Sequence, residues 1–188
     1  MILSLVWWAL FWCWLLSEIF IALAMRTRHS GGDVHDRGTQ KILWIVLLVA
    51  ITAANVIRGT SASMFGRAHW LVPFSILLLA IALCIRWTAI LSLGKSFSAN
   101  VAIRDTQTIY KGGLYRWVRH PSYLGLLLVF LAVALHSQNW ISFFIALIPT
   151  TLAVLYRIRV EENVLTHAFG DEYATYSRTT WRLLPWFY

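Results

Sequence analysis

The sequence predicts an all-α integral membrane protein with five transmembrane helices, and three observations support this fold class. Hydrophobic residues fill 59% of the 188 positions and charged residues only 13%, whereas soluble domains carry roughly 25% charged residues. The apolar residues form long continuous runs, as membrane-spanning helices require. The mean hydropathy of +0.66 and the eleven tryptophans exclude both a disordered chain and a water-soluble domain.

The apolar runs define five predicted spans in one membrane domain, at residues 2–25, 42–57, 70–93, 121–136 and 140–156. The first run is too long for a signal peptide and no Lys or Arg precedes Arg26, so we expect a retained membrane anchor. The last two spans share an apolar stretch that is interrupted only around residues 136–139, which predicts a helical hairpin with a tight turn.

Two polar segments complete the predicted domain. Residues 94–120 are basic and contain a Gly–Gly pair at 112–113, which indicates a loop rather than a span. Residues 157–188 form a charged tail with a helical pattern through Ala168 and an aromatic end. Both segments follow apolar runs that end on the same side of a five-span bundle, so we expect them to meet there.

The basic residues predict the orientation of the bundle. Of the 16 Lys and Arg residues, 13 lie in the segments 26–41, 94–120 and 157–188. The positive-inside rule places these segments in the cytosol and the N-terminus outside. The expected location is the inner (plasma) membrane in a prokaryote or the endoplasmic reticulum in a eukaryote.

Two charged residues, Glu18 and Arg86, lie within the predicted spans. Each is seven residues from the cytosolic end of its run, at a common depth of roughly 10 Å. An isolated charge at that depth costs about 2.5–3.5 kcal/mol even on a lenient insertion scale. We therefore expect the two side chains to pair inside the protein, directly or through water. The alternative is that Arg86 extends to the headgroups and Glu18 is protonated.

Polar side chains are concentrated at the cytosolic ends of spans three to five, which predicts a site where a cytosolic ligand meets a membrane-embedded one. Residues 111–125 combine basic and aromatic side chains with Pro121 in a first helical turn, whose backbone N–H groups favour an anion. Arg157 and Glu161 share a helix face further along the chain. Alone, residues 111–125 are equally consistent with an aromatic belt at the membrane interface, and Arg157 with Glu161 is better explained as an ion pair at the end of a span. Their position at the same membrane depth favours a site.

The ordered motifs of the C-terminal half resemble the isoprenylcysteine carboxyl methyltransferases over residues 93–185. The matching segments are Gly113-Leu-Tyr115, Arg119-His-Pro-Ser-Tyr123 with Gly125, Arg157-x-x-x-Glu161-Glu162, Phe169-Gly-Asp-Glu-Tyr173 and Tyr176. Arg-His-Pro-x-Tyr followed by Glu-Glu also occurs in related membrane methyltransferases, including phospholipid N-methyltransferases. A similar membrane fold occurs in sterol and steroid reductases.

The resemblance implies an S-adenosylmethionine pocket at the cytosolic ends of spans three to five and a prenylcysteine substrate that enters from the bilayer. It implies that the cofactor is held by Gln107, Thr108, Ile109, Tyr110, Tyr115, His120, Pro121, Ser122, Tyr123 and Glu161. Arg157 is implied as the catalytic and substrate-binding residue that holds the acceptor carboxylate. The chain departs from the family at Ala102, where a Gln or Glu usually contacts the cofactor.

The residue types agree with carboxyl methylation. A carboxylate is already an anionic nucleophile at neutral pH, so the enzyme has to align the two partners and exclude water. Arg157 offers a bidentate clamp that Lys does not reproduce. The two cysteines lie in apolar runs, and we expect no metal site and no nucleic-acid partner.

Several other functions remain open at this stage. A methyltransferase acting on a phospholipid amine or a small thiol would share the cofactor half, although an amine acceptor would need a base and would gain little from Arg157. An NADPH-dependent sterol-type reductase would share the architecture. A non-enzymatic membrane scaffold would leave both charged clusters without a role.

Overall fold

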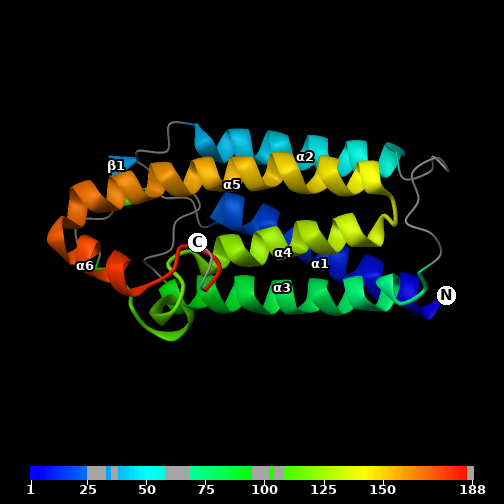
Figure 1. Cartoon of the computed structure of the whole chain (residues 1–188), viewed down its shortest axis with the longest axis horizontal. Coiled ribbons are helices and arrows are strands. Elements are labelled where there is room, and N and C mark those ends of the chain that lie inside the picture. The colour runs from blue at the N-terminus through cyan, green and yellow to red at the C-terminus, as the bar shows by residue number, and fades with distance from the viewer. Residues whose placement is uncertain (25–32, 35–37, 58–67, 95–101, 104–107, 186–188) are drawn as a thin grey trace.

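The computed structural model describes residues 1–24, 33–34, 38–57, 68–94, 102–103 and 108–185. Its five long helices are α1 (Ile2–Ala24), α2 (Thr39–Ile57), α3 (Leu71–Leu93), α4 (Pro121–His136) and α5 (Trp140–Phe169). They lie side by side with alternating directions, and the short α6 (Asp171–Thr179) lies at one end (Figure 1). α3 packs against α4, α2 packs against α5, and α4 also contacts α5. Except at the end of α5, the helices begin and end within three residues of the predicted boundaries.

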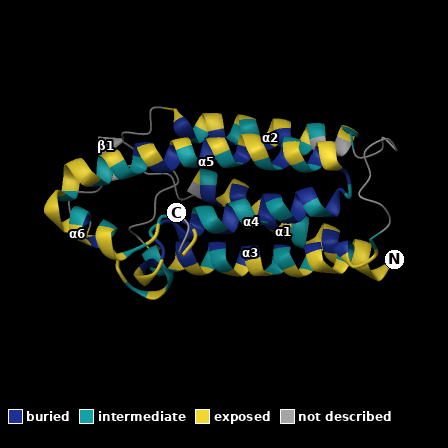
Figure 2. Cartoon of the chain, viewed as in Figure 1, coloured by how far each residue is buried: buried dark blue, intermediate teal, exposed yellow. Residues whose placement is uncertain are grey.

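Three of the five helices are long and apolar enough to cross a membrane, namely α1, α3 and α5. α2 and α4 are shorter apolar helices. The 16 residues of α4 extend roughly 24 Å, compared with a hydrocarbon core of about 30 Å. Large apolar side chains such as Leu16, Leu48, Leu77 and Leu152 are more than half exposed, and exposed residues run along the outer helix faces (Figure 2). Such a surface fits a lipid environment. That all five helices cross the membrane, and that the N-terminus lies outside the cytosol, stay predictions.

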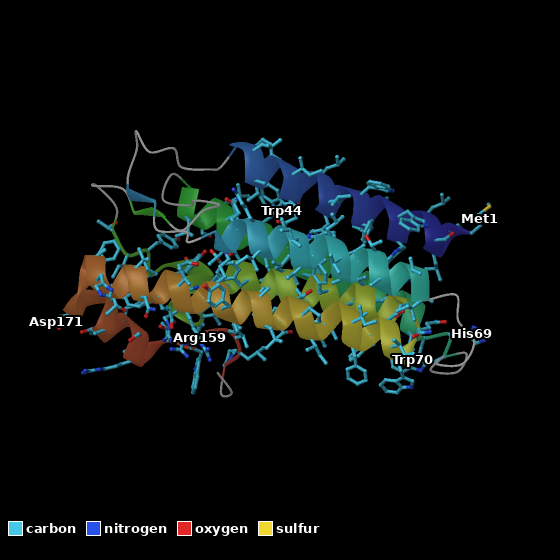
Figure 3. The ribbon with its side chains drawn as sticks, turned by 90° about the horizontal axis from the view of Figure 1, so that it is seen from above. Met1, Trp44, His69, Trp70, Arg159 and Asp171 are labelled. Atoms are coloured by element: carbon cyan, nitrogen blue, oxygen red, sulfur yellow. The ribbon has the colours of Figure 1, made fainter. Side chains whose placement is uncertain are left out.

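The two ends of the bundle differ in chemistry. Figure 3 places Arg159 and Asp171 at one end and Met1, His69 and Trp70 at the other. The end that carries Arg159 and Asp171 also holds α6 and is called the polar end below. The buried core between the two ends comes from all five long helices, through Trp14, Leu47, Leu79, Phe130 and Val154.

A small antiparallel strand pair interrupts the otherwise helical fold. β1 (Asp33–Val34) pairs with β2 (Ala102–Ile103), with Asp33 opposite Ile103. Both segments lie in polar stretches that the sequence predicts to be loops. Two-residue strands carry no periodic pattern, so their pairing depends on the bundle bringing distant segments together. Ala102, the departure from the family pattern, therefore lies in a paired strand.

The helical hairpin predicted between the last two spans is confirmed. Asn139 caps α5, because its side-chain oxygen accepts hydrogen bonds from the backbone N–H groups of Ile141 at 3.0 Å and Ser142 at 3.1 Å. Gln138 takes a left-handed conformation with φ of 53°. These two residues reverse the chain within a three-residue turn.

α5 continues well beyond its apolar part. The helix is unbroken from Trp140 to Phe169, so the charged tail begins as a helical extension. Gly170 ends it with a φ of +50°, a conformation that favours glycine, and its N–H donates to the carbonyl of Thr166 at 2.9 Å. The chain then turns back into α6, which the sequence analysis did not predict (Figure 1).

The predicted pairing of Glu18 with Arg86 is confirmed. Arg86 on α3 donates through Nη2 to Oε2 of Glu18 on α1 at 2.7 Å, and through Nε to Oε1. Nη1 of Arg86 donates to the backbone carbonyl of Ser122 at 2.8 Å, in the first turn of α4. Gly125 makes this approach possible, because a Cβ atom there would lie 2.8–2.9 Å from the backbone and Cβ of Arg86. The ion pair therefore connects three helices next to the polar end.

Candidate functional site

Both charged clusters singled out in the sequence lie at the polar end of the bundle. The 3₁₀ helix η4 (Gly113–Arg116) leads toward α4, and Pro121 occupies the first turn of α4 as predicted. His120 is the last residue before this helix and is 4% exposed. The charged extension of α5 supplies the facing side chains.

The hydroxyl of Tyr123 lies between Glu161 and Arg157. It donates to Oε2 of Glu161 at 2.7 Å and accepts from Nε of Arg157 at 2.7 Å. Both partners project from α5, one helical turn apart, onto the first turn of α4. Hydrogen bonds to charged groups are stronger than neutral ones, so these three side chains hold each other in place. The sequence predicts that residues 111–125 and the helix face of Arg157 and Glu161 form one site. Their meeting is confirmed for Tyr123.

Arg157 is held by a second hydroxyl, from α2. Its Nη1 donates to Oγ1 of Thr39 at 2.9 Å, and the two residues are 3% and 1% exposed. A buried guanidinium is stable only where its N–H groups are bonded and its charge is balanced. Thr39 and Tyr123 provide such bonds, and the carboxylate of Glu161 lies on the far side of the Tyr123 hydroxyl. α2 thus takes part in the site.

Glu162 forms the centre of a separate cluster of charges. Its Oε1 lies 3.1 Å from Nε of Arg119 and 3.4 Å from Nε2 of His120, and its Oε2 lies 2.8 Å from Nε of Arg182. Glu161 and Glu162 are neighbours on one helix, so their side chains diverge toward different partners. His120 consequently faces Glu162.

The C-terminal segment holds the residues that precede α4. The N–H of Arg119 donates to the carbonyl of Trp181 at 2.7 Å, and the N–H of His120 donates to that of Arg182 at 3.1 Å. The N–H of Tyr123 donates to the carbonyl of His120 at 3.1 Å. These backbone donors are used within the protein, so the start of α4 offers fewer donors to an anion than the sequence predicted.

Tyr115 connects η4 to both α3 and α6. Its side chain is buried and its hydroxyl lies 3.4 Å from the carbonyl of Ala89. Its own carbonyl accepts a hydrogen bond from the hydroxyl of Tyr176 at 2.7 Å. Burial, assisted by the charge of Glu161, raises the pKa of Tyr115 above its usual range, and burial raises the pKa of Tyr176 to about 12. Both phenols stay neutral donors at physiological pH.

Comparison with known proteins extends the likeness across most of the chain. The sequence pattern of the isoprenylcysteine carboxyl methyltransferase (ICMT) family matches residues 75–167. The protein-S-isoprenylcysteine O-methyltransferase of Schizosaccharomyces pombe is 30% identical over 177 residues, which cover 87% of this chain and 75% of the yeast protein. The chain belongs to the ICMT family.

Other ICMT relatives and methanethiol S-methyltransferases match shorter stretches. The methanethiol S-methyltransferase of Mycobacterium tuberculosis is 40% identical over 73 residues, which cover 39% of this chain and 29% of that protein. The mouse (Mus musculus) protein-S-isoprenylcysteine O-methyltransferase is 30% identical over 118 residues, 62% of this chain and 42% of its own length. The chain therefore spans well under half of these two curated relatives.

A solved ICMT structure has the same fold. The eukaryotic intramembrane Ras methyltransferase ICMT superposes with a TM-score of 0.62 at 23% identity, over 78% of this chain and 52% of that one. Together with the long apolar helices, this fold identifies an integral membrane protein.

The structure brings together part of the cofactor set implied by the ICMT resemblance. Tyr123 and Glu161 are hydrogen-bonded, and Tyr115 lies within range of the charge of Glu161. At the start of α4, Pro121 and Ser122 are buried in the first turn and His120 is bound to Glu162. Before η4, Ile109 is half-buried, whereas Thr108 and Tyr110 are exposed. Gln107 lies outside the described residues.

Several residues of the site had no role in the sequence analysis. Arg119 and Glu162 belong to the motifs that resemble the ICMT family, but the resemblance implies no function for them. Their pairing is visible only where the two motifs face each other in the structure. Arg182 lies in the tail, where no pattern marks it. Thr39 is an ordinary helix-start residue by sequence, and only the packing of α2 against α5 reveals its contact with Arg157.

Proposed function

We propose that this chain is an S-adenosylmethionine-dependent methyltransferase that esterifies the C-terminal carboxylate of a prenylated cysteine. The observation that carries the proposal is the unit of Tyr123, Arg157 and Glu161, in which a buried cation and a carboxylate share one hydroxyl. Membership of the ICMT family supports a methyl-transfer reaction.

The polar end suits the chemistry of S-adenosylmethionine, which has a cationic sulfonium and amino group together with hydrogen-bonding groups. The carboxylate of Glu161, fixed by Tyr123 at the first turn of α4, is an appropriate partner for a cationic group. The neutral phenol of Tyr115 adds a polar surface nearby. In our proposal the other contacts come from Gln107, Thr108, Ile109, Tyr110, His120, Pro121 and Ser122. When bound, the cofactor supplies an activated methyl group.

Arg157 has the role of orienting the acceptor carboxylate. The planar guanidinium can bind both oxygens of a carboxylate, and its position is set by hydrogen bonds to Tyr123 and Thr39 before any ligand arrives. Because the carboxylate is already ionised, no proton has to be removed from it. The residues of the chain therefore act by alignment and by exclusion of water.

A thiol acceptor is the second candidate, since a methanethiol S-methyltransferase is among the similar proteins. A thiol has a pKa of about 8.5 and has to lose its proton first, and a nearby Arg157 would lower that pKa. A phospholipid amine would also have to lose a proton and would gain nothing from a cation.

A side-by-side assay tests these acceptors. Purified protein in lipid, supplied with labelled S-adenosylmethionine, is given a farnesylcysteine analogue, methanethiol or phosphatidylethanolamine in separate reactions. We expect a base-labile methyl ester on the farnesylcysteine analogue. Transfer to the thiol or the amine alone would contradict the carboxylate proposal, and binding of NADPH in place of S-adenosylmethionine would indicate a reductase.

Substitution of Arg157 tests its role. We expect Arg157→Lys to lower kcat/KM for the carboxylate acceptor by about 10- to 100-fold, because the charge remains but the bidentate fork is lost. Binding of S-adenosylmethionine should be largely retained. Arg159→Lys is the matched control, since Arg159 is exposed two residues further along the same helix. Near-normal turnover by Arg157→Lys would refute the assignment.

A further inference from the structure

The hydroxyl of Tyr173 is a buried polar group with an unmet hydrogen bond. Tyr173 lies in α6 and is 4% exposed. Its hydroxyl oxygen has no hydrogen-bond partner in the part of the chain that the structure describes. Buried hydroxyls in native proteins are nearly always paired, so this one is open to a partner that the described residues do not supply.

The unmet hydrogen bond does not reflect poor packing in this region. Tyr176, one turn further along α6, donates its hydroxyl to the carbonyl of Tyr115 at 2.7 Å. Nε of Arg119 donates to Glu162 at 3.1 Å. These two groups are bonded within the protein, and Nε of Arg182 lies 2.8 Å from Oε2 of Glu162, whereas the Tyr173 hydroxyl has no such partner among the described residues.

The position of Tyr173 relates it to the candidate cofactor site. α6 turns back at Gly170 from the end of α5, the helix that carries Glu161 and Glu162. Burial and the charges of Glu162 and Glu161 raise the pKa of Tyr173, so the phenol stays protonated and acts as a donor. The charge of Glu161 acts on Tyr115 as well. The ring of Tyr173 lies 6.1 Å from the ring of Tyr176, whose hydroxyl is bonded to the carbonyl of Tyr115.

We propose that the Tyr173 hydroxyl donates a hydrogen bond to an acceptor oxygen or nitrogen of bound S-adenosylmethionine. The inference rests on the proposed function and gives a role to Tyr173, which belongs to a motif of the family resemblance but not to the cofactor set that the resemblance implies. The cofactor is favoured over the methyl acceptor because Tyr173 packs beside Tyr176, which is bonded to Tyr115 of the implied cofactor set, whereas Arg157 is held from α2.

Tyr173→Phe removes the hydroxyl and leaves the packed ring in place. In the absence of ligand, thermal stability should stay the same or rise, because no protein hydrogen bond is lost. The dissociation constant of S-adenosylhomocysteine, measured by isothermal titration calorimetry, should rise about tenfold, the usual effect of deleting one donor to a ligand. The two effects have opposite signs, which a general loss of packing does not produce.

Two tyrosine variants serve as controls. Tyr176→Phe should lower the stability of the ligand-free protein, because its hydroxyl has a protein partner. Tyr156→Phe, at a position on α5 that is 46% exposed, should change neither quantity.

Three results would overturn the inference. An unchanged dissociation constant in Tyr173→Phe would mean that the hydroxyl binds water, and a less stable ligand-free variant would mean that it has a protein partner. Failure of the wild-type protein to bind S-adenosylhomocysteine would overturn this inference together with the proposed function.

Discussion

Neutralising Glu18 by Glu18→Gln tests the buried ion pair with almost no change in shape. The carboxylate accepts two hydrogen bonds from Arg86 and a third, at 3.2 Å, from the indole N–H of Trp14. The side chains of Glu18 and Arg86 are 5% and 7% exposed. Loss of the negative charge leaves the guanidinium in the bundle with neutral acceptors, such as the Ser122 carbonyl, in place of its ionic partner.

The expected cost follows from that burial. Breaking a buried ion pair by removing one partner typically destabilises a protein by about 3–5 kcal/mol. In a chain of this length each kcal/mol shifts the melting temperature by roughly 2–4 °C, so we expect a decrease of about 6–20 °C. Arg86→Met should have an effect of the same order. The double variant removes both charges and should be less destabilised than the sum of the two single variants, by about 1–3 kcal/mol.

Thermal unfolding in detergent, followed by tryptophan fluorescence, measures the stability of the wild-type protein, the two single variants and the double variant. The exposed pair of Lys111 and Glu172, 2.9 Å apart with side chains 49% and 55% exposed, provides the control. Glu172→Gln should change the stability by at most about 0.5 kcal/mol. If the effects of Glu18→Gln and Arg86→Met add to within about 0.5 kcal/mol, the two charges are not coupled and the reasoning is refuted.

Two further substitutions probe the first turn of α4. Gly125→Ala places a Cβ atom 2.8 Å from the backbone nitrogen of Arg86, so we expect a loss of about 1–3 kcal/mol in thermal unfolding; full stability would show that α3 and α4 separate freely. Tyr123→Phe removes the hydroxyl that joins Arg157 to Glu161, and kcat/KM should fall by about 10- to 100-fold. Wild-type kinetics in that variant would show that the hydroxyl does not organise the site.

The helices and their order could be predicted from the sequence because the signal for each is local. Long apolar runs, Pro121 at a helix start and the polar break around residues 136–139 each mark a boundary without reference to the rest of the chain. The pairing of Glu18 with Arg86 was also predictable, because the membrane makes an isolated charge costly and these two share a depth. Tyr123 and Glu161 belong to motifs of the family, which linked them before their contact was seen.

The partners within the site were decided by the tertiary structure. His120 pairs with Glu162, and Arg182 reaches the same carboxylate from the tail. Thr39 holds Arg157 across 118 residues of sequence. Such contacts depend on which face each helix turns to its neighbour, and a rotation of one residue, about 100°, would turn Glu162 toward the partners of Glu161.

By itself, the sequence determined that this protein is a helical membrane protein of the ICMT type with its chemistry at one end of the bundle, because hydropathy and motif spacing act over short distances. Only the tertiary structure decided that α2 and α6 contribute to that end, that β1 pairs with β2, and that the buried hydroxyl of Tyr173 has no hydrogen-bond partner among the described residues. The physical reason is that hydrogen bonds and ion pairs form over about 3 Å. Their partners are fixed by the packing of whole helices, which no local pattern records.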